Sequence, residues 1–230
     1  MILVIVAKFI AVIVVGYLLG SIPFGVLVGK RMAKADVRQH GSGKMGATNV
    51  LRTAGKKAAA VVAILDLLKG MLAVLFAGLI WWGLSTIEGV SNSWWLLSSA
   101  QVTAGLAAVV GHIWPIFLKF RGGRGVAPFF GGLVALCPVA ALFGGEALIL
   151  GAGLTGFASL GSILGVIGVY TILVPLIIMH GFPLEYLIYA LVGTIIIIVM
   201  HRDNIIRLMS GKERRLGDKV DSLPPTKSTG

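Results

Sequence analysis

Long apolar stretches fill most of the chain, and short polar segments separate them. A membrane-spanning helix needs about 20 mostly apolar residues, or fewer where the span is short or re-entrant. Seven stretches meet this requirement, near residues 3–28, 58–82, 95–117, 126–144, 146–161, 162–180 and 184–200. The pattern therefore predicts an all-α, polytopic membrane protein with about seven transmembrane helices.

The span boundaries in the second half of the chain depend on glycine and proline, because Glu146 is the one charged residue between 126 and 179. Such residues mark the expected turns. We place the turns at Pro138, Gly144-Gly145 and Gly161-Ser162. Six or eight spans are the alternatives. The first stretch has no basic residues before it, so we expect a retained span rather than a removed signal peptide.

Composition supports a membrane protein and excludes other classes. Hydrophobic residues make up 57% of the chain and charged residues 13%, whereas about a quarter of a globular chain is charged. A soluble enzyme, a secreted disulfide scaffold and a disordered chain are therefore excluded. The 32 glycines suit close packing of transmembrane helices. The single cysteine, Cys137, excludes an intramolecular disulfide and a cysteine-based metal cluster.

Basic residues are concentrated in three segments. The chain has 20 Lys and Arg against 9 Asp and Glu, which gives a net charge of +11. Residues 30–57 carry eight of the cations, residues 119–124 carry three, and the tail from Arg202 carries seven. With seven spans, all three segments fall on one side of the membrane.

The positive-inside rule places this basic side in the cytoplasm. We therefore expect the N-terminus outside the cell and the C-terminus in the cytoplasm. In this topology residues 1–201 form one integral membrane domain with cytoplasmic loops at 30–57 and 118–126, and residues 202–230 form a basic cytoplasmic tail.

Two loops on the basic side have the chemistry of an anion site. Residues 41–49 read Gly-Ser-Gly-Lys-Met-Gly-Ala-Thr-Asn, and residues 120–126 place three glycines around Arg124. Glycines let backbone N–H groups turn toward an anion, and hydroxyls, amides and cations add donors and charge. Each loop alone also fits a plain turn. Two of them on one face favour a diphosphate or two phosphate-bearing substrates, although neither matches the Walker A pattern.

Ionisable residues in the apolar stretches add a third indication. Asp66 and Lys69 lie three residues apart on one helix face, where charges are costly and usually paired or functional. A charge-compensated pair that joins helices explains them equally well. His112 lies near the cytoplasmic end of the third stretch, where packing is the alternative role. His201 opens a polar and basic cluster that extends to Arg207.

Standard catalytic motifs are absent from the sequence. It contains no Gly-x-Ser-x-Gly elbow, no His-Glu-x-x-His pair and no His-x-x-x-x-Asp pair, so no nucleophile with an adjacent base is visible. The acidic residues are too scattered to suggest a metal site. We therefore expect neither a metal nor another cofactor, and chemistry that rests on electrostatic positioning of a phosphorylated substrate.

Three blocks of the sequence resemble one bacterial family. The first block comprises Gly-Ser-Ile-Pro-Phe-Gly at 20–25, Asp-Val-Arg at 36–38, Gly-Ser-Gly-Lys-Met-Gly-Ala-Thr-Asn-Val-Leu-Arg at 41–52 and Asp-Leu-Leu-Lys-Gly at 66–70. The second comprises Gly-His at 111–112 and Phe-Arg-Gly-Gly-Arg-Gly-Val-Ala at 120–127, and the third begins with His-Arg-Asp-Asn-Ile at 201–205. A short Ser-Leu-Gly-Ser at 159–162 lies between them. In content and order these blocks resemble the PlsY-type acyl-phosphate:glycerol-3-phosphate acyltransferases.

The resemblance implies a seven-helix bacterial inner-membrane enzyme with a cytoplasmic active site. Such an enzyme moves a fatty acyl group from acyl phosphate to the 1-hydroxyl of glycerol 3-phosphate, and it releases lysophosphatidic acid and phosphate for phospholipid synthesis. Its partners would be glycerol 3-phosphate, acyl phosphate and membrane lipids, and not nucleic acid. The two loops on the basic side agree with two phosphorylated substrates, although composition and spacing alone do not name them.

The resemblance also implies the site residues. The expected catalytic residues are Ser42, Arg52, Arg124, His201 and Asn204. The expected substrate-binding residues are Arg38, Gly41, Gly43, Lys44, Gly46, Thr48, Asn49, Lys69, His112, Gly122, Gly123, Gly125, Ser162 and Glu213. The mechanism we expect is direct acyl transfer, with either His201 or the departing phosphate as the base.

Four positions depart from the family pattern. Lys44 stands where the family usually has Asn, Arg124 and Pro128 replace Lys and Thr, and Gly156 replaces a polar or basic residue. The rival hypothesis is a transporter or channel for a phosphorylated metabolite, which would have inverted repeats and a site at the midplane of the membrane. No convincing repeat is present, and the motifs lie on one face. A lipid-binding structural subunit would leave the loop motifs unexplained.

Overall fold

The computed structural model describes residues 2–88 and 94–218, with the side chains of 84–88 outside the description. These parts form ten α-helices, two short 3-10 helices and no strand, which confirms the predicted all-α class. The elements are α1 (Ile2–Ser21), α2 (Phe24–Ala33), η1 (Val37–Gln39), α3 (Ala47–Glu88), α4 (Trp94–Ile113), η2 (Ile116–Leu118), α5 (Val126–Leu136), α6 (Pro138–Thr155), α7 (Ala158–Gly168), α8 (Tyr170–His180), α9 (Leu184–Met200) and α10 (Arg202–Met209). The predicted tail beyond residue 218 lies outside the described residues.

Several of these helices are long and apolar enough to cross a membrane. Five segments in the described ranges qualify, and a sixth qualifies if α9 and α10, which meet at 59°, are counted together. The chain is therefore a multi-pass membrane protein. The predicted count of seven is not confirmed, because the stretch at 126–144 divides between the 11-residue α5 and the start of α6.

Two of the predicted turns are wrong. The chain leaves the helix at Cys137 and resumes at Pro138, as expected for proline in a first helical turn. Gly144-Gly145 lies inside α6, however, and Gly161-Ser162 lies inside α7. A Cβ added to Gly144 would lie 2.5 Å from Cγ2 of Val169, and one added to Gly161 would lie 2.5 Å from the carbonyl oxygen of Leu148. These glycines let α6 and α7 pack closely, and the real turn is at Gly156, where φ is +76°.

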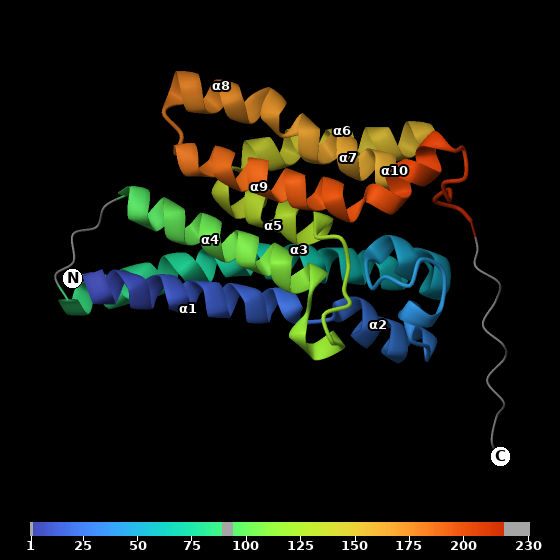
Figure 1. The fold of residues 1–230 in the computed structure, drawn as a ribbon, viewed down its shortest axis with the longest axis horizontal. Coiled ribbons are helices and arrows are strands. Elements are labelled where there is room, and N and C mark those ends of the chain that lie inside the picture. The colour runs from blue at the N-terminus through green and yellow to red at the C-terminus, as the bar shows by residue number, and fades with distance from the viewer. Residues whose placement is uncertain (1, 89–93, 219–230) are drawn as a thin grey trace, which may run out of the picture.

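The long helices run side by side in two groups (Figure 1). The first contains α1, α3 and α4, and the second contains α6, α7 and α8, with α5 and α9 between them. Glycine again sets the closest approach, since a Cβ on Gly20 of α1 would lie 2.1 Å from the carbonyl oxygen of Ala108 in α4. In the core between the groups, the stacked rings of Phe129 and Tyr189 have centroids 5.3 Å apart.

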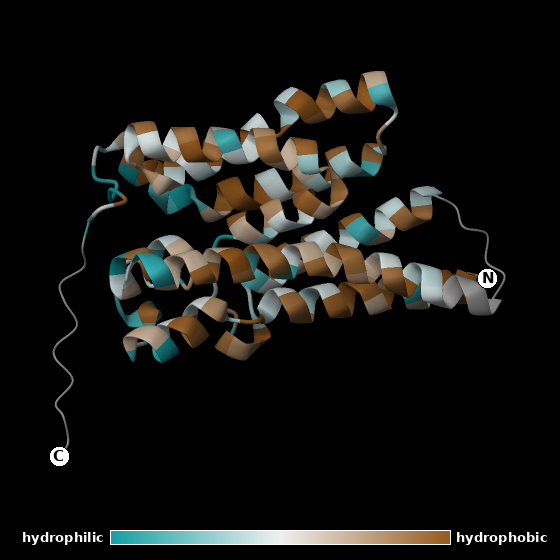
Figure 2. Ribbon diagram, turned by 180° about the vertical axis from the view of Figure 1, so that it is seen from behind, coloured by the Kyte–Doolittle hydropathy of each residue, from teal (hydrophilic) through white to brown (hydrophobic). Residues whose placement is uncertain are grey.

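All three basic segments lie at one end of the helices, as predicted. Figure 2 shows most of the hydrophilic ribbon at the end where α2 and α10 lie, and apolar ribbon along the helices. Arg52 of α3 donates hydrogen bonds to carbonyl groups of the tail, and Arg38 of the first loop lines a pocket together with Arg121 of the second. The assignment of this end to the cytoplasm stays a prediction.

Candidate active site

The first loop is organised by the side chain of Asn49, which is 3% exposed. Its Nδ2 donates to the carbonyl oxygens of Val37 at 2.7 Å, His40 at 3.1 Å and Lys44 at 2.8 Å. Its Oδ1 accepts a hydrogen bond of 2.8 Å from the backbone N–H of Ser42. Asn49 therefore holds the loop in a fixed shape, and every hydrogen-bonding group of its amide is directed at the backbone.

Glycines make this loop shape possible. Gly41 and Gly43 have φ values of +62° and +69°, which favour glycine because it has no Cβ. Gly46 starts α3, since its carbonyl oxygen accepts bonds from the N–H groups of Asn49 and Val50. Thr48 lies in the first turn of α3, half-buried. The loop thus places Ser42, Lys44 and Thr48 at the start of α3, where the free backbone N–H groups of the helix favour binding of an anion.

Arg52 lies one turn further along α3 and contacts the C-terminal tail. Its Nη2 donates to the carbonyl oxygens of Arg214 at 3.2 Å and Arg215 at 3.0 Å. Its buried Nε has no hydrogen-bond partner among the described residues. Gly55 follows with φ +85° and ψ 177°, and this break separates the short first part of α3 from its membrane-spanning part.

The second loop lies flat against the end of α4. The N–H of Gly122 donates to the carbonyl oxygen of Ile113, and the N–H of Gly123 donates to that of His112, both at 3.0 Å. A Cβ on Gly122 would lie 2.1 Å from the carbonyl oxygen of His112, and one on Gly123 would lie 1.9 Å from the imidazole Nε2 of His112. Neither position has room for a side chain. Gly125, with φ +85°, then turns the chain into α5.

Arg124 is the central cation of the candidate site. Its half-buried guanidinium makes no hydrogen bond or ion pair within residues 2–88 and 94–218. Burial lowers the pKa of Arg124 to about 10, with Arg207 and Arg52 adding to the effect and Glu213 opposing it. The side chain is therefore still charged at neutral pH. Burial and the charge of Arg124 also lower the pKa of Lys44.

The third segment is held together by Glu213. Its Oε1 accepts hydrogen bonds from Asn204 Nδ2 at 2.6 Å and Ser159 Oγ at 3.0 Å, and its Oε2 accepts one from Arg207 Nε at 2.8 Å. Burial alone would raise the pKa of Glu213, but these hydrogen bonds hold it below the usual value. Asn204 keeps its Oδ1 buried and without a hydrogen-bond partner among the described residues. This oxygen is a free acceptor.

His201 lies between the spanning helix α9 and α10 and is 1% exposed. Its Nδ1 lies 2.8 Å from the carbonyl oxygen of Ile197, so Nδ1 carries the proton and Nε2 is the acceptor. Burial and the charge of Arg124 lower the pKa of His201 to about 4. The imidazole is therefore neutral at physiological pH.

Lys69 and His112 join a different group of side chains. Lys69 Nζ lies 2.7 Å from Oδ1 of Asp66 and donates a 3.0 Å hydrogen bond to the carbonyl oxygen of Ile22. Nδ1 of His112 lies 3.5 Å from the same Asp66 oxygen. This buried network connects the α1–α2 break, α3 and α4. Because the second loop packs against His112, this network also fixes the position of that loop.

Two other predicted residues, Ser162 and Arg38, make their contacts away from Arg124. Ser162 donates its Oγ to the carbonyl oxygen of Ala158 at 2.8 Å, within its own helix. Arg38 pairs with Asp36 at 2.6 Å and lines a separate pocket. The structure brings together the first loop, Arg52, Arg124, His201, Asn204 and Glu213 through the electrostatic and hydrogen-bonded contacts described above.

The sequence interpretation missed Ser159 and Arg207 as site residues. Both bind the carboxylate of Glu213 directly. The Ser-Leu-Gly-Ser piece pointed to the first, and the spacing of Asn204 and Arg207 on one helix face pointed to the second. Within residues 2–88 and 94–218, no group of three or more His, Cys, Asp or Glu side chains could hold a metal ion.

Known proteins that are similar to this chain identify the family. Residues 10–211 match the family described as Glycerol-3-phosphate acyltransferase. Glycerol-3-phosphate acyltransferase 3 of Dehalococcoides mccartyi (strain CBDB1) is 63% identical over 94% of this chain and 99% of its own length. Glycerol-3-phosphate acyltransferase of Crocosphaera subtropica is 44% identical over 90% of this chain and 94% of its own length.

Two crystal structures of PlsY, an integral membrane glycerol 3-phosphate acyltransferase, also match. Its glycerol 3-phosphate form has a TM-score of 0.74 and its lysophosphatidic acid form one of 0.72. Both are 36% identical to this chain and cover 90% of it and 94% of their own length. The sequence blocks, the helical membrane fold and these relatives agree, and the chain belongs to the glycerol-3-phosphate acyltransferase family.

Proposed function

We propose that this protein transfers a fatty acyl group from an acyl phosphate to the 1-hydroxyl of glycerol 3-phosphate, forming lysophosphatidic acid and inorganic phosphate. The observation that carries the proposal is Arg124, a half-buried cation without a hydrogen-bonded or ion-paired partner in the described ranges. Lys44, Arg52 and Arg207 add positive charge around it. A cluster of this kind suits phosphate groups on both substrates.

The reaction needs no protein nucleophile. The glycerol oxygen attacks the acyl carbonyl carbon, a new ester C–O bond forms, and the C–O bond to phosphate breaks. Arg124 and Lys44 neutralise the acyl phosphate, which makes the phosphate a better leaving group and polarises the carbonyl. The first loop and Arg52 hold glycerol 3-phosphate by its own phosphate, so that its hydroxyl lies close to the carbonyl carbon.

The proton of the glycerol hydroxyl passes to the departing phosphate. A phosphate monoester has a second pKa of about 6, so the departing phosphate can take the proton. We assign His201 the role of accepting a hydrogen bond from the glycerol hydroxyl at Nε2, since its lowered pKa makes it a weak base. The free Oδ1 of Asn204 is suited to the second glycerol hydroxyl.

Except for Arg38 and Ser162, which have no role in this proposal, the remaining predicted residues have supporting roles. Ser42, Thr48 and the loop glycines supply donors to phosphate, while Asn49, Glu213, Lys69 and His112 hold donors in place. The concentration of basic loops at one end favours an active site that faces the cytoplasm, in the inner membrane of a bacterium.

The experiment is a donor comparison with the full-length protein in detergent. Palmitoyl phosphate with labelled glycerol 3-phosphate is expected to yield lysophosphatidic acid and phosphate in equal amounts, and palmitoyl-CoA is expected to yield neither. Product from palmitoyl-CoA alone would contradict the donor assignment. No product from folded protein, together with glycerol 3-phosphate uptake into proteoliposomes, would favour the transporter hypothesis.

The departures from the family pattern have their own test. Arg124→Lys replaces a planar fork of donors by a point charge, and Lys44→Asn removes a charge. If the site has been retuned, Arg124→Lys raises the KM for palmitoyl phosphate. Unchanged kinetics in both variants would make these departures neutral.

A further inference from the structure

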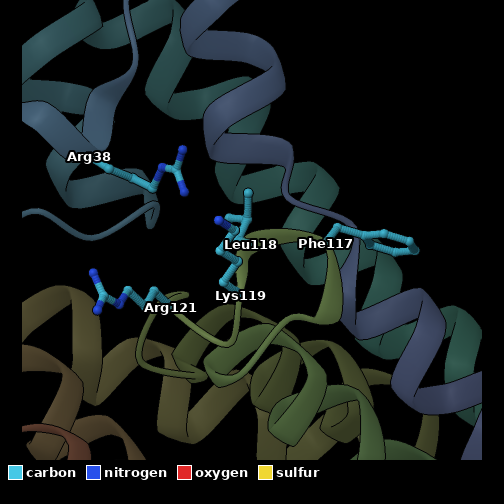
Figure 3. Close-up of a pocket in the computed structure, with 5 residues that line it drawn as sticks. All are labelled: Arg38, Phe117, Leu118, Lys119 and Arg121. Atoms are coloured by element: carbon cyan, nitrogen blue, oxygen red, sulfur yellow. The ribbon is translucent and has the colours of Figure 1, made fainter.

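A basic pocket lies at the same end of the molecule as the candidate active site, between the first loop and the turn after α4. It has a volume of about 580 Å³ and is lined by Arg38, Phe117, Leu118, Lys119 and Arg121. Figure 3 shows Arg38 directed from the first loop toward the turn that carries Leu118 and Lys119. The proposed reaction uses none of the lining residues from the turn.

The pocket carries excess positive charge. Asp36 neutralises one of its three cations, because it accepts hydrogen bonds from Nε of Arg38 at 3.0 Å and from Nη2 at 2.6 Å. This pair fixes the guanidinium and leaves its Nη1 donors available. Lys119 and Arg121 are exposed and make no side-chain hydrogen bond or ion pair within the described residues.

The turn that presents Lys119 and Arg121 has a fixed conformation. Lys119 and Phe120 have φ values of +51° and +61°, which are uncommon for residues with a Cβ. Three backbone hydrogen bonds hold them there, from Leu118 and Phe120 to the carbonyl oxygen of Pro115 at 3.1 and 3.0 Å, and from Arg121 to that of Leu118 at 3.2 Å. The two cations therefore project from a rigid support.

Apolar side chains next to the pocket place it at a membrane surface. Trp114 is 41% exposed, Ile116 is 49% exposed and Phe117, which lines the pocket, is 61% exposed. Tryptophan and other large apolar residues beside cations are typical of the membrane–water interface. The hydroxyl of Tyr17 on α1 donates to the carbonyl oxygen of Trp114 at 2.8 Å, which ties this turn to a spanning helix. A ligand of this pocket would therefore lie at the depth of lipid head groups.

We infer that this pocket binds the phosphate head group of an anionic membrane phospholipid. Lys119, Arg121 and the remaining donors of Arg38 contact the head group, and the acyl chains pass along Phe117 and Ile116 into the bilayer. A zwitterionic lipid adds a positive choline group against the same cations, so it binds more weakly. The inference concerns lipid binding alone and holds whether or not the proposed reaction is correct.

The test is native mass spectrometry of the full-length protein in detergent, titrated with dioleoylphosphatidylglycerol and, separately, with dioleoylphosphatidylcholine. The double variant Lys119→Gln/Arg121→Gln is expected to lose at least about tenfold in its affinity for phosphatidylglycerol and to leave phosphatidylcholine binding unchanged. Lys56→Gln/Lys57→Gln is the matched control, since it removes the same charge from two exposed lysines outside the pocket. The control is expected to bind as the unmodified protein does.

Three results would overturn the inference. The first is an equal loss of affinity for phosphatidylglycerol in the two double variants, which would show that net charge alone explains the binding. The second is no loss in Lys119→Gln/Arg121→Gln. The third is a change confined to inorganic phosphate binding, measured in the same titration without lipid, which would assign the pocket to a free anion. Gel-filtration profiles check folding, and the single variant Arg121→Gln replaces the double one if the latter aggregates.

Discussion

The side-chain amide of Asn204 donates a 2.6 Å hydrogen bond to Oε1 of Glu213, and this contact joins α10 to the segment that follows it. Arg207 and Ser159 bind the same carboxylate. The candidate acceptor Asn204 is therefore positioned by a residue beyond α10, and the site depends on the segment that follows this helix.

Removing the Glu213 carboxylate is expected to disorder this corner of the site. Hydrogen bonds to charged groups contribute about 1.5–3 kcal/mol each, so Glu213→Ala is expected to lower the rate of acyl transfer at least about tenfold and to lower the thermal midpoint. Glu213→Gln should have a smaller effect, because it keeps one acceptor. Glu146→Gln, at an exposed position of α6, is the control. Activity assays and thermal unfolding check this, and full activity in Glu213→Ala would contradict the assigned role.

The same carboxylate gives an expected pH dependence of stability. The folded pKa of Glu213 is below its unfolded value of about 4.3. Its stabilising effect is therefore complete above that unfolded value and disappears as the pH falls through the folded pKa. The difference in thermal midpoint between the unmodified protein and Glu213→Gln is expected to be larger at neutral pH and to shrink in strong acid. A constant difference would show that the charge of Glu213 does not stabilise the fold.

Asn49 is expected to act through the shape of its loop. Asn49→Asp replaces the Nδ2 donor by an oxygen that faces three carbonyl groups. The loss of two N–H donors at about 1 kcal/mol each should lower kcat/KM for glycerol 3-phosphate at least about tenfold. Thr53→Val, which removes only hydroxyl contacts to backbone carbonyl groups of its own helix, should be nearly neutral. Equal kinetics for the two variants would show that the loop keeps its shape without Asn49.

Asp66 and Lys69 form a buried ion pair at 2.7 Å. Breaking such a pair from one side leaves an uncompensated charge and costs about 3–5 kcal/mol. We expect Asp66→Asn and Lys69→Met each to lower the thermal midpoint strongly, and the double variant to lose much less than the sum of the two. A double-mutant cycle in detergent measures this coupling. Additive losses would mean that each residue acts independently.

His201 is expected to be neutral throughout the physiological pH range, because its pKa is lowered to about 4. The ratio of kcat between the unmodified protein and His201→Gln should then stay constant from about pH 5.5 to pH 8, since the imidazole does not titrate there. Any fall of kcat at low pH should come from protonation of the substrate phosphates and should appear in both proteins. A ratio that falls as the pH drops through about 6.5 would instead identify His201 as the base.

The sequence predicted the parts of this structure that follow from burial and charge. Apolar stretches became helices because a bilayer leaves no other partner for their backbone groups. The three basic segments lie together because charge fixes the side of each loop. The family blocks named the residues from 41 to 52 and from 201 to 213 that meet at the same end of the molecule.

Glycine limited the prediction of boundaries. Glycine allows a turn at Gly156, where φ is positive, and a close contact between helices at Gly144. The sequence alone does not distinguish these two uses. The contacts between distant segments were also hidden, since nothing near Arg52 indicates that its guanidinium meets the tail carbonyl groups of Arg214 and Arg215. Such pairings depend on how the loops fold back over the helix ends.

The central claim is direct acyl transfer in a cationic site without a covalent acyl-enzyme. The most direct test mixes the protein with a stoichiometric amount of palmitoyl phosphate, labelled in the acyl chain, with and without glycerol 3-phosphate. Without the acceptor we expect neither phosphate release nor protein-bound label, and with it one phosphate per lysophosphatidic acid. A burst of one phosphate per protein without acceptor, together with label bound to the protein, would contradict the account.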